Sequence, residues 1–148
     1  MSVSDSPIIV DSDALIALVN VDDALAHDAM RLVEQVRNMK ATLVYPATTI
    51  AETVTTLHRK LNRPDLAHAL VASVQAHQFI IEPIDQDILA QAAQLYYPQG
   101  SKQDTFFDAI VAAVAQKLNA TTIFSFDKWY AKQGFALIPN LYSVQDRI

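Results

Sequence analysis

The chain has 148 residues, 51% of them hydrophobic, and its 16 acidic residues outnumber 11 Lys and Arg, for a net charge of −5. This length and composition predict one domain with a substantial core, and the acidic balance excludes a protein that binds nucleic acid through positive charge alone. The lack of cysteine excludes disulfides and thiolate metal sites, and two glycines are too few for a glycine-rich phosphate loop.

The start of the chain carries neither a secretory signal nor a long apolar segment. A signal peptide would begin with a basic region, and a membrane span needs about 20 apolar residues. We therefore expect a soluble, cytoplasmic protein with no membrane segment.

The segment Ile8–Val10 runs directly into Asp11, Ser12 and Asp13, and a helical pattern begins there. A run of branched apolar residues predicts a buried strand of a parallel sheet. Asp11 would then lie at the carboxyl end of that strand, where open α/β sheets bind ligands. Capping of the following helix is the other interpretation of Asp11, and Asp13 could also serve as the cap.

Strands and helices are expected to alternate along the rest of the chain. Apolar runs predict further strands at residues 41–45, 79–81, 121–125 and 135–138, and helical spacing predicts helices at 13–20, 25–39, 48–61, 64–77, 85–96, 104–119 and from 128 to Gly134. This alternation predicts a single α/β domain over residues 1–148, with its core at 8–138 and a parallel sheet flanked by helices on both faces. The tail after residue 138 is too short to assign.

Acidic residues also occur at helix starts, where capping competes with function as an explanation. Thr49 and Glu52 have the spacing of a capping box. Asp104 and Asp108 are four residues apart in one expected helix, so that Asp104 can be its N-cap while Asp108 lies one turn inside. A buried acid without a partner is costly, so Asp108 is the acid with the weakest structural explanation.

In a parallel sheet of this kind, four acids can reach the same edge: Asp11, Glu52, Asp108 and Asp127. Their like charges would raise one another's pKa, and a hard divalent cation such as Mg²⁺, which prefers carboxylate oxygens, would relieve that repulsion. Such a site suits phosphodiester hydrolysis by a metal-activated water. Ser125, which ends a strand just before Asp127, would be a supporting polar group.

These acids and their flanking residues resemble the motifs of PIN domains, and the resemblance covers about residues 8–138. The motifs are Val10–Asp13, Thr49–Glu52, Phe107–Ala113 and Phe124–Lys128. The chain length is similar to that of the VapC-type toxins of toxin–antitoxin pairs. The resemblance implies a three-layer fold and a Mg²⁺- or Mn²⁺-dependent endoribonuclease that acts on RNA, is often a homodimer and is held inactive by a small antitoxin protein.

Carried over residue by residue, the resemblance makes Asp11, Glu52, Asp108 and Asp127 the catalytic, metal-binding acids. Asp104 would be an accessory acid and Ser125 a supporting residue. Asp13 departs from the family pattern, and we interpret it as the cap of the first helix.

Two alternatives remain open. Asp11 and Asp13 also resemble the nucleophile and general acid of haloacid-dehalogenase-like phosphatases, although no lysine is suitably placed and Asp104 and Asp108 would be a metal pair within a helix. A non-catalytic PIN-like module that binds RNA or a protein is the second alternative. A rise in melting temperature on adding a divalent metal would favour the enzyme over the binding module.

Overall fold

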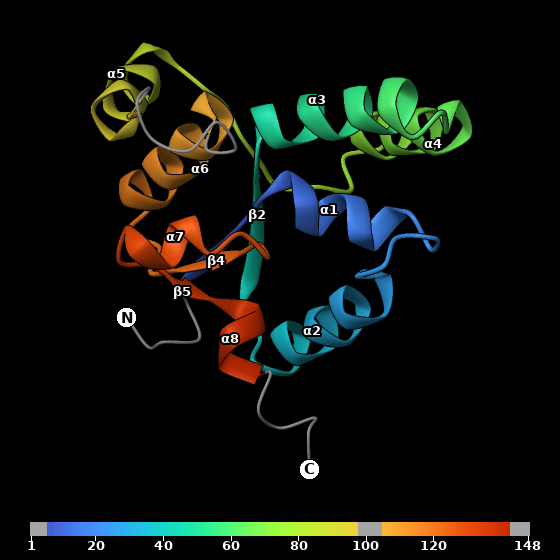
Figure 1. The fold of residues 1–148 in the computed structure, drawn as a ribbon, viewed down its shortest axis with the longest axis horizontal. Helices are drawn as coiled ribbons and strands as arrows, with labels where there is room; N and C mark the ends of the chain where they lie inside the picture. The colour runs from blue at the N-terminus through green and yellow to red at the C-terminus, as the bar shows by residue number, and fades with distance from the viewer. Residues whose placement is uncertain (1–5, 98–104, 143–148) are drawn as a thin grey trace.

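The computed structural model describes residues 6–97 and 105–142. Five strands form one sheet in the order β3-β2-β1-β4-β5, and each neighbouring pair is parallel (Figure 1). The strands are β1 (Pro7–Val10), β2 (Thr42–Pro46), β3 (Ile81–Glu82), β4 (Thr122–Phe124) and β5 (Ala136–Leu137). Because all five run in the same direction, their carboxyl ends meet at one edge of the sheet.

Helices connect the strands. They are α1 (Ser12–Val19), α2 (Ala26–Asn38), α3 (Ala47–Thr55), α4 (Pro64–Gln75), α5 (Gln86–Leu95), α6 (Phe106–Lys117), α7 (Trp129–Lys132) and α8 (Ile138–Tyr142), with a π-helical turn, η2 (Thr56–Lys60), after α3. The expected parallel α/β fold is confirmed. The helix expected at 48–61 is in fact α3 followed by η2, and the sequence did not predict α8.

The sheet has a separate apolar core on each face. Successive side chains of a strand point to opposite faces. In the central strand, Ile8 and Val10 pack with α1, α2, α3 and α4, whereas Ile9 packs with α5 and α6. In β4 the same alternation places Phe124 in the first core and Ile123 in the second. The helices therefore cover both faces of the sheet, as expected (Figure 1).

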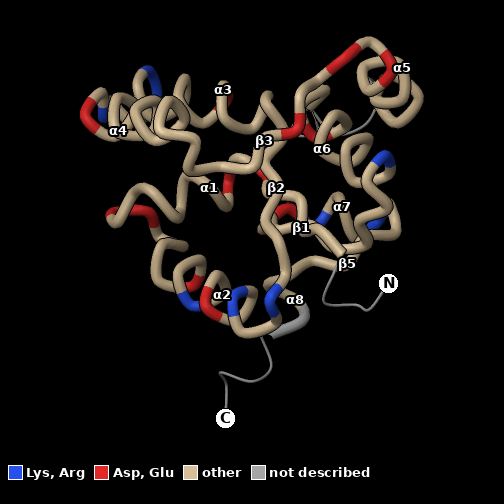
Figure 2. Tube along the Cα trace, turned by 180° about the vertical axis from the view of Figure 1, so that it is seen from behind, with Lys and Arg blue, Asp and Glu red and all other residues tan. Residues whose placement is uncertain are grey.

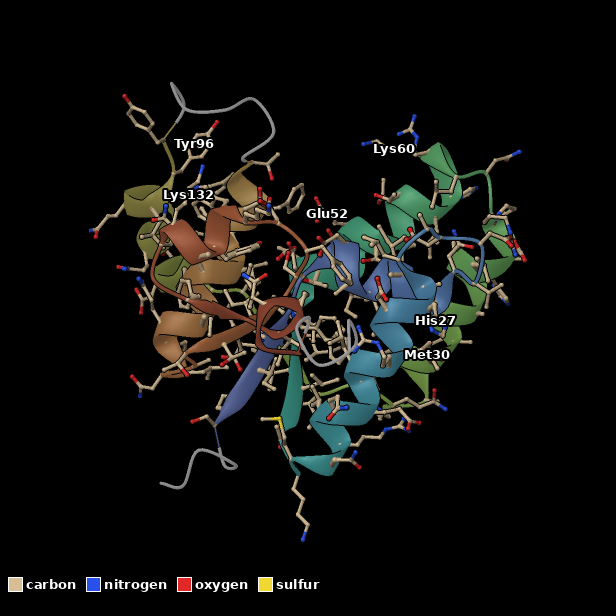
Figure 3. All side chains as sticks on the ribbon, turned by 60° about the horizontal axis from the view of Figure 1, so that its bottom comes forward. His27, Met30, Glu52, Lys60, Tyr96 and Lys132 are labelled. Atoms are coloured by element: carbon tan, nitrogen blue, oxygen red, sulfur yellow. The ribbon has the colours of Figure 1, made fainter. Side chains whose placement is uncertain are left out.

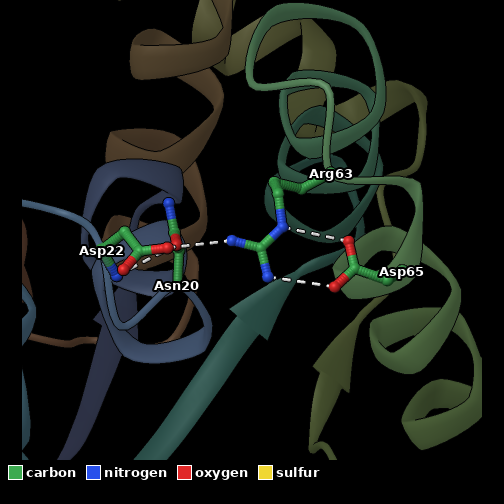
Figure 4. A network of polar contacts seen from close by, with 4 residues as sticks. All are labelled: Asn20, Asp22, Arg63 and Asp65. Atoms are coloured by element: carbon green, nitrogen blue, oxygen red, sulfur yellow. Dashed lines mark hydrogen bonds and ion pairs between the residues drawn. The ribbon is translucent and has the colours of Figure 1, made fainter.

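A polar contact joins two segments on the α1–α4 side of the molecule. The Arg63 guanidinium donates to the Asp65 carboxylate at 3.0 Å and to Asp22 at 3.1 Å (Figure 4). Asp22 lies in the turn after α1, and its amide donates to the side chain of Asn20. The contact therefore ties that turn to the start of α4, although exposed ion pairs of this kind add little stability.

Charged positions of both signs are spread over the helices, and acidic and basic positions alternate along α2 (Figure 2). Across residues 6–97 and 105–142, no helix has the length and apolar character needed to cross a bilayer.

Candidate active site

Asp11 lies at the carboxyl end of β1, where the sequence placed it. Its amide donates to the Phe124 carbonyl at 3.0 Å, which continues the pairing of β1 with β4. Its carboxylate is the N-cap of α1 and accepts from the Ser12 amide at 2.7 Å. The residue is only 4% exposed. Asp11 therefore caps the helix, as one interpretation expected, and it is also a buried acid at the carboxyl edge of the sheet, where its catalytic role stays a prediction.

Asp13 does not cap α1, and the interpretation of it as the cap is wrong. Asp11 occupies the N-cap position, which leaves the Asp13 carboxylate available for another segment. It accepts from the Phe126 amide at 2.9 Å and lies 3.1 Å from the Ser125 hydroxyl. Asp13 therefore ties the start of α1 to the loop after β4.

Ser125 links the acids that follow β1 to the acid that follows β4. Its fully buried hydroxyl lies 3.1 Å from Asp11 Oδ2 and 3.1 Å from Asp13 Oδ1, and it accepts from the Asp127 amide at 3.0 Å. A hydroxyl carries one hydrogen, so it can donate to one of the two carboxylates at a time. Ser125 is the polar residue directly after β4, where the sequence placed it. Its supporting role in the chemistry stays a prediction.

Asp108 is in the first turn of α6, not one turn inside the helix. The helix begins at Phe106 with Thr105 as its N-cap, and Asp108 completes a capping box by accepting from the Thr105 amide at 2.8 Å. Asp108 therefore does have a structural explanation, contrary to the expectation from a helix starting at residue 104. Asp104 itself, the predicted accessory acid, lies outside the described residues.

Tyr130 joins Asp11 to Asp108. Its hydroxyl lies 2.9 Å from Asp11 Oδ2 and 3.4 Å from Asp108 Oδ1, and the side chain is fully buried. Burial raises the pKa of Tyr130 well above its ordinary value, and the charges of Asp11 and Asp108 raise this pKa further. Tyr130 thus remains a hydrogen-bond donor at neutral pH. Sequence reasoning missed this residue, because a tyrosine in a short helix shows no polar role until the fold is known.

Glu52 lies on α3, near the middle of the view in Figure 3. The capping box expected for Thr49 and Glu52 is not formed, since α3 starts at Ala47. The Thr49 hydroxyl instead donates to the Val10 carbonyl at 2.9 Å, which fixes α3 to the end of β1. Glu52 is half-buried, and its charge acts on Asp108.

Asp127 follows β4 by three residues and accepts from the Trp129 amide at 2.9 Å. Through its own amide it contacts Ser125. The hydrogen bonds therefore connect Asp11, Asp13, Asp108 and Asp127 through two hydroxyl groups, whereas Glu52 is related to this network through its charge.

Burial and mutual repulsion make ionisation unfavourable in this network. Burial raises the pKa of Asp11 well above its ordinary value, and the charges of Asp13 and Asp108 raise it further. Burial likewise raises the pKa of Asp13, against the lowering effect of the Phe126 amide. Burial raises the pKa of Asp108 from 3.8 to about 6, with the charges of Asp127 and Glu52 also raising it.

The donor chemistry fits a hard cation, but a complete ligand set is not preassembled. Between residues 6 and 142, leaving aside 98–104, no three Asp, Glu or His side chains are arranged to hold a metal ion. In the same parts of the chain, no Lys or Arg forms an ion pair with Asp11, Asp13 or Asp108. When ionised, these carboxylates would have an excess of negative charge that a divalent cation would offset. Their role as metal ligands remains a prediction.

Comparison with known proteins settles the family. The family model of the PIN domain matches residues 8–136. The chain belongs to the PIN-domain family. The match covers the acid-bearing motifs, so the resemblance seen in the sequence is confirmed. The observed parallel α/β fold agrees with this family.

A solved structure agrees with this family. The crystal structure of VapC20 from Mycobacterium tuberculosis, described as a sarcin-ricin loop cleaving toxin, superimposes with a TM-score of 0.75 at 25% identity. The alignment covers 87% of this chain and 96% of that one. No curated protein sequence matched the chain. The similarity to VapC20 extends over almost the whole of both molecules, which confirms the likeness to a VapC-type toxin.

Proposed function

We propose that this PIN domain is a metal-dependent endoribonuclease that hydrolyses RNA phosphodiester bonds. The observation that carries the proposal is the meeting of Asp11 and Asp108, from the end of β1 and the start of α6, on the buried hydroxyl of Tyr130. Two acids that are far apart in sequence thus contact the same hydroxyl, at the edge of the sheet where α/β proteins bind ligands.

The four acids Asp11, Glu52, Asp108 and Asp127 would hold the cation, Mg²⁺ or Mn²⁺. A bound ion of this kind activates a water and stabilises the leaving oxygen of a phosphodiester. The chain's own contribution is to position the carboxylates: the Tyr130 hydroxyl contacts Asp11 and Asp108, and the Ser125 hydroxyl contacts Asp11 and accepts from the Asp127 amide. Ionisation of the buried acids, which burial opposes, would be favoured by the cation.

RNA is the substrate class that the similarity to VapC20 supports, since that protein is described as cleaving the sarcin-ricin loop. By the same likeness we propose that this chain is the toxin of a toxin–antitoxin pair. Its small antitoxin partner and its homodimeric state, both implied by the resemblance, remain predictions.

The deciding experiment is cleavage of RNA by purified protein in Mg²⁺, Mn²⁺ or EDTA. The substrates are a sarcin-ricin loop fragment and a mixed RNA pool. We expect cleavage with metal, none in EDTA, and a large loss of activity in Asp108→Asn, since the substitution removes a carboxylate charge that would bind the cation.

Asp87→Asn is the matched control. Asp87 is also an acid in the first turn of a helix, α5, but it is exposed and has no contact with the network. We expect it to cut as the wild type does. Equal cleavage by Asp108→Asn and wild type would contradict the assignment of the site. Failure of the wild type to cut either RNA, with no rise in melting temperature on adding Mg²⁺ or Mn²⁺, would favour the non-catalytic binding module.

A further inference from the structure

A pocket lies beside the acids, on the side of the molecule formed by α5, α6 and α7. Its volume is about 250 Å³. It is lined by Leu95, Tyr96, Tyr97, Thr105, Ala109, Trp129 and Gln133. The lining is aromatic and apolar with a few polar groups, as is usual for small-molecule sites.

Two lining residues are hydrogen-bonded directly to the candidate catalytic acids. The Thr105 amide donates to Asp108 at 2.8 Å, and the Trp129 amide donates to Asp127 at 2.9 Å. The backbone at Thr105 and Trp129 therefore both lines the pocket and holds the carboxylates of Asp108 and Asp127. A ligand in the pocket would lie next to whatever the acids act on.

Two of the aromatic side chains at the pocket are exposed to solvent and are not part of the core. Tyr96 is 40% exposed and Tyr97 is 65% exposed. Each of two further rings holds its neighbour in an edge-on contact: Phe106 with Tyr96 at 5.7 Å, and Tyr130 with Trp129 at 5.2 Å between ring centres. Tyr96 and Trp129 are thus each packed against another ring, and both line the pocket, where their rings would be available to stack on a ligand.

The polar groups at the pocket are suited to a nucleotide. The exposed Gln133 offers an amide that can both donate and accept a hydrogen bond. Lys132, which does not itself line the pocket, precedes Gln133 at the end of α7 and is exposed. Figure 3 draws Lys132 and Tyr96 at the same end of the molecule. Lys132 provides a positive charge for a backbone phosphate at this end of an acidic protein.

We propose that this pocket binds one unstacked nucleobase of the RNA, next to the bond that is cleaved. The inference rests on the proposed function and deepens it. Single-stranded RNA is commonly recognised by stacking splayed bases on aromatic side chains. A neutral base also suits the position, because the nearby carboxylates of Asp108 and Asp127 repel an anion but do not repel an uncharged ring.

Trp129 makes the proposal directly measurable, because it is the only tryptophan in the chain. The test titrates the protein with adenosine or cytidine in EDTA and follows the tryptophan fluorescence. Nucleosides carry no phosphate, so they are not repelled by the acids and cannot be cleaved. Ribose is the control ligand without a base. We expect saturable quenching by the nucleosides and none by ribose.

Variants of Tyr96 test the stacking surface. Tyr96→Leu keeps an apolar side chain but removes the ring, and we expect it to weaken adenosine binding by at least about fivefold. Tyr96→Phe keeps the ring and should bind as the wild type does. Leu89→Ser is the matched surface control: Leu89 lies on α5, which Tyr96 caps, and has the same 40% exposure, but it does not line the pocket.

The outcomes separate this proposal from the proposed function. Saturable quenching that Tyr96→Leu weakens supports the base pocket, even if the protein cuts no RNA. Absence of saturable quenching, or equal binding by Tyr96→Leu and wild type, overturns the base pocket, even if the protein proves to be a metal-dependent ribonuclease.

Discussion

At the scale of single residues, Tyr130 is the group on which the site depends. Its hydroxyl lies 2.9 Å from the buried carboxylate of Asp11 and 3.4 Å from the half-buried carboxylate of Asp108, and its one hydrogen can be donated to one of them at a time. Tyr130→Phe removes this donor while keeping the ring in the core. Because a buried carboxylate that loses a donor is penalised, we expect the free energy of unfolding to fall by about 1–3 kcal/mol at pH 7.5. Urea denaturation followed by circular dichroism measures the change.

A double-mutant cycle with Asp11→Asn identifies the cause. If the loss comes from the bond to a charged Asp11, then Tyr130→Phe should destabilise the Asp11→Asn background by clearly less than it destabilises the wild type. The same loss in both backgrounds would show that Tyr130 acts through packing alone.

The residue scale also shows where sequence reasoning succeeds. The positions of Asp11 and Ser125 could be predicted because each follows a buried strand, and position at a strand end needs only local pattern. The contacts of Asp13 and Tyr130 could not, since their partners lie 113 and 119 residues away in the chain. For Asp108, a two-residue error in the start of α6 changed a capping residue into an apparently unexplained acid.

At the scale of elements, α3 shows how one helix is fixed to the sheet. Thr49 and Thr53 lie one turn apart in α3 and are both buried, at 2% and 0% exposed. Thr49 donates to the Val10 carbonyl of β1, whereas the Thr53 hydroxyl has no hydrogen-bond partner in residues 6–97 or 105–142. The same Thr-to-Val substitution should therefore affect stability differently at the two positions.

Thr49→Val removes a buried hydrogen bond and leaves the Val10 carbonyl without that donor, so we expect the free energy of unfolding to fall by about 1–2 kcal/mol. Thr53→Val replaces an unpaired buried hydroxyl with a methyl group of similar shape, so we expect stability to be unchanged or to rise by about 1 kcal/mol. Chemical denaturation of the two variants under the same conditions measures both effects. Equal destabilisation would contradict the hydrogen bond as the link between α3 and β1.

At the scale of the whole molecule, the fold could be predicted because alternating strands and helices leave few possible topologies. The central strand could be recognised from the sequence, because Ile8, Ile9 and Val10 form an unbroken apolar run, which is typical of a strand buried on both faces. Helix α8 could not be predicted, because Ile138 at its start belongs to a core that exists only after the sheet has formed.

The acids also give the whole molecule a pH-dependent stability. Burial raises the pKa of Asp108 from 3.8 to about 6, and raises the pKa of Asp11 and Asp13 as well. A carboxyl with a higher pKa in the folded state binds its proton more tightly there than in the unfolded chain. Its stabilising contribution is therefore complete below about pH 4 and is lost as the pH rises through about 6.

We therefore expect the wild type in EDTA to be less stable at pH 7.5 than at pH 5. A pKa that rises from 3.8 to about 6 on folding corresponds to about 3 kcal/mol in total. Only about 1.4 kcal/mol of this falls between pH 5 and pH 7.5, since the contribution already declines from about pH 4. Because Asp108 is only partly buried, we expect it to account for about 1 kcal/mol or less of the difference. Asp108→Asn should remove that part of the loss, while its amide oxygen can still accept from the Thr105 amide. Urea denaturation at the two pH values measures the difference.

Glu34→Gln is the control, because it removes the same charge from the exposed surface of α2. It should keep the full pH dependence of stability. If Glu34→Gln reduced the pH dependence of the free energy of unfolding as much as Asp108→Asn does, the cause would be the net charge of the protein and not the candidate site.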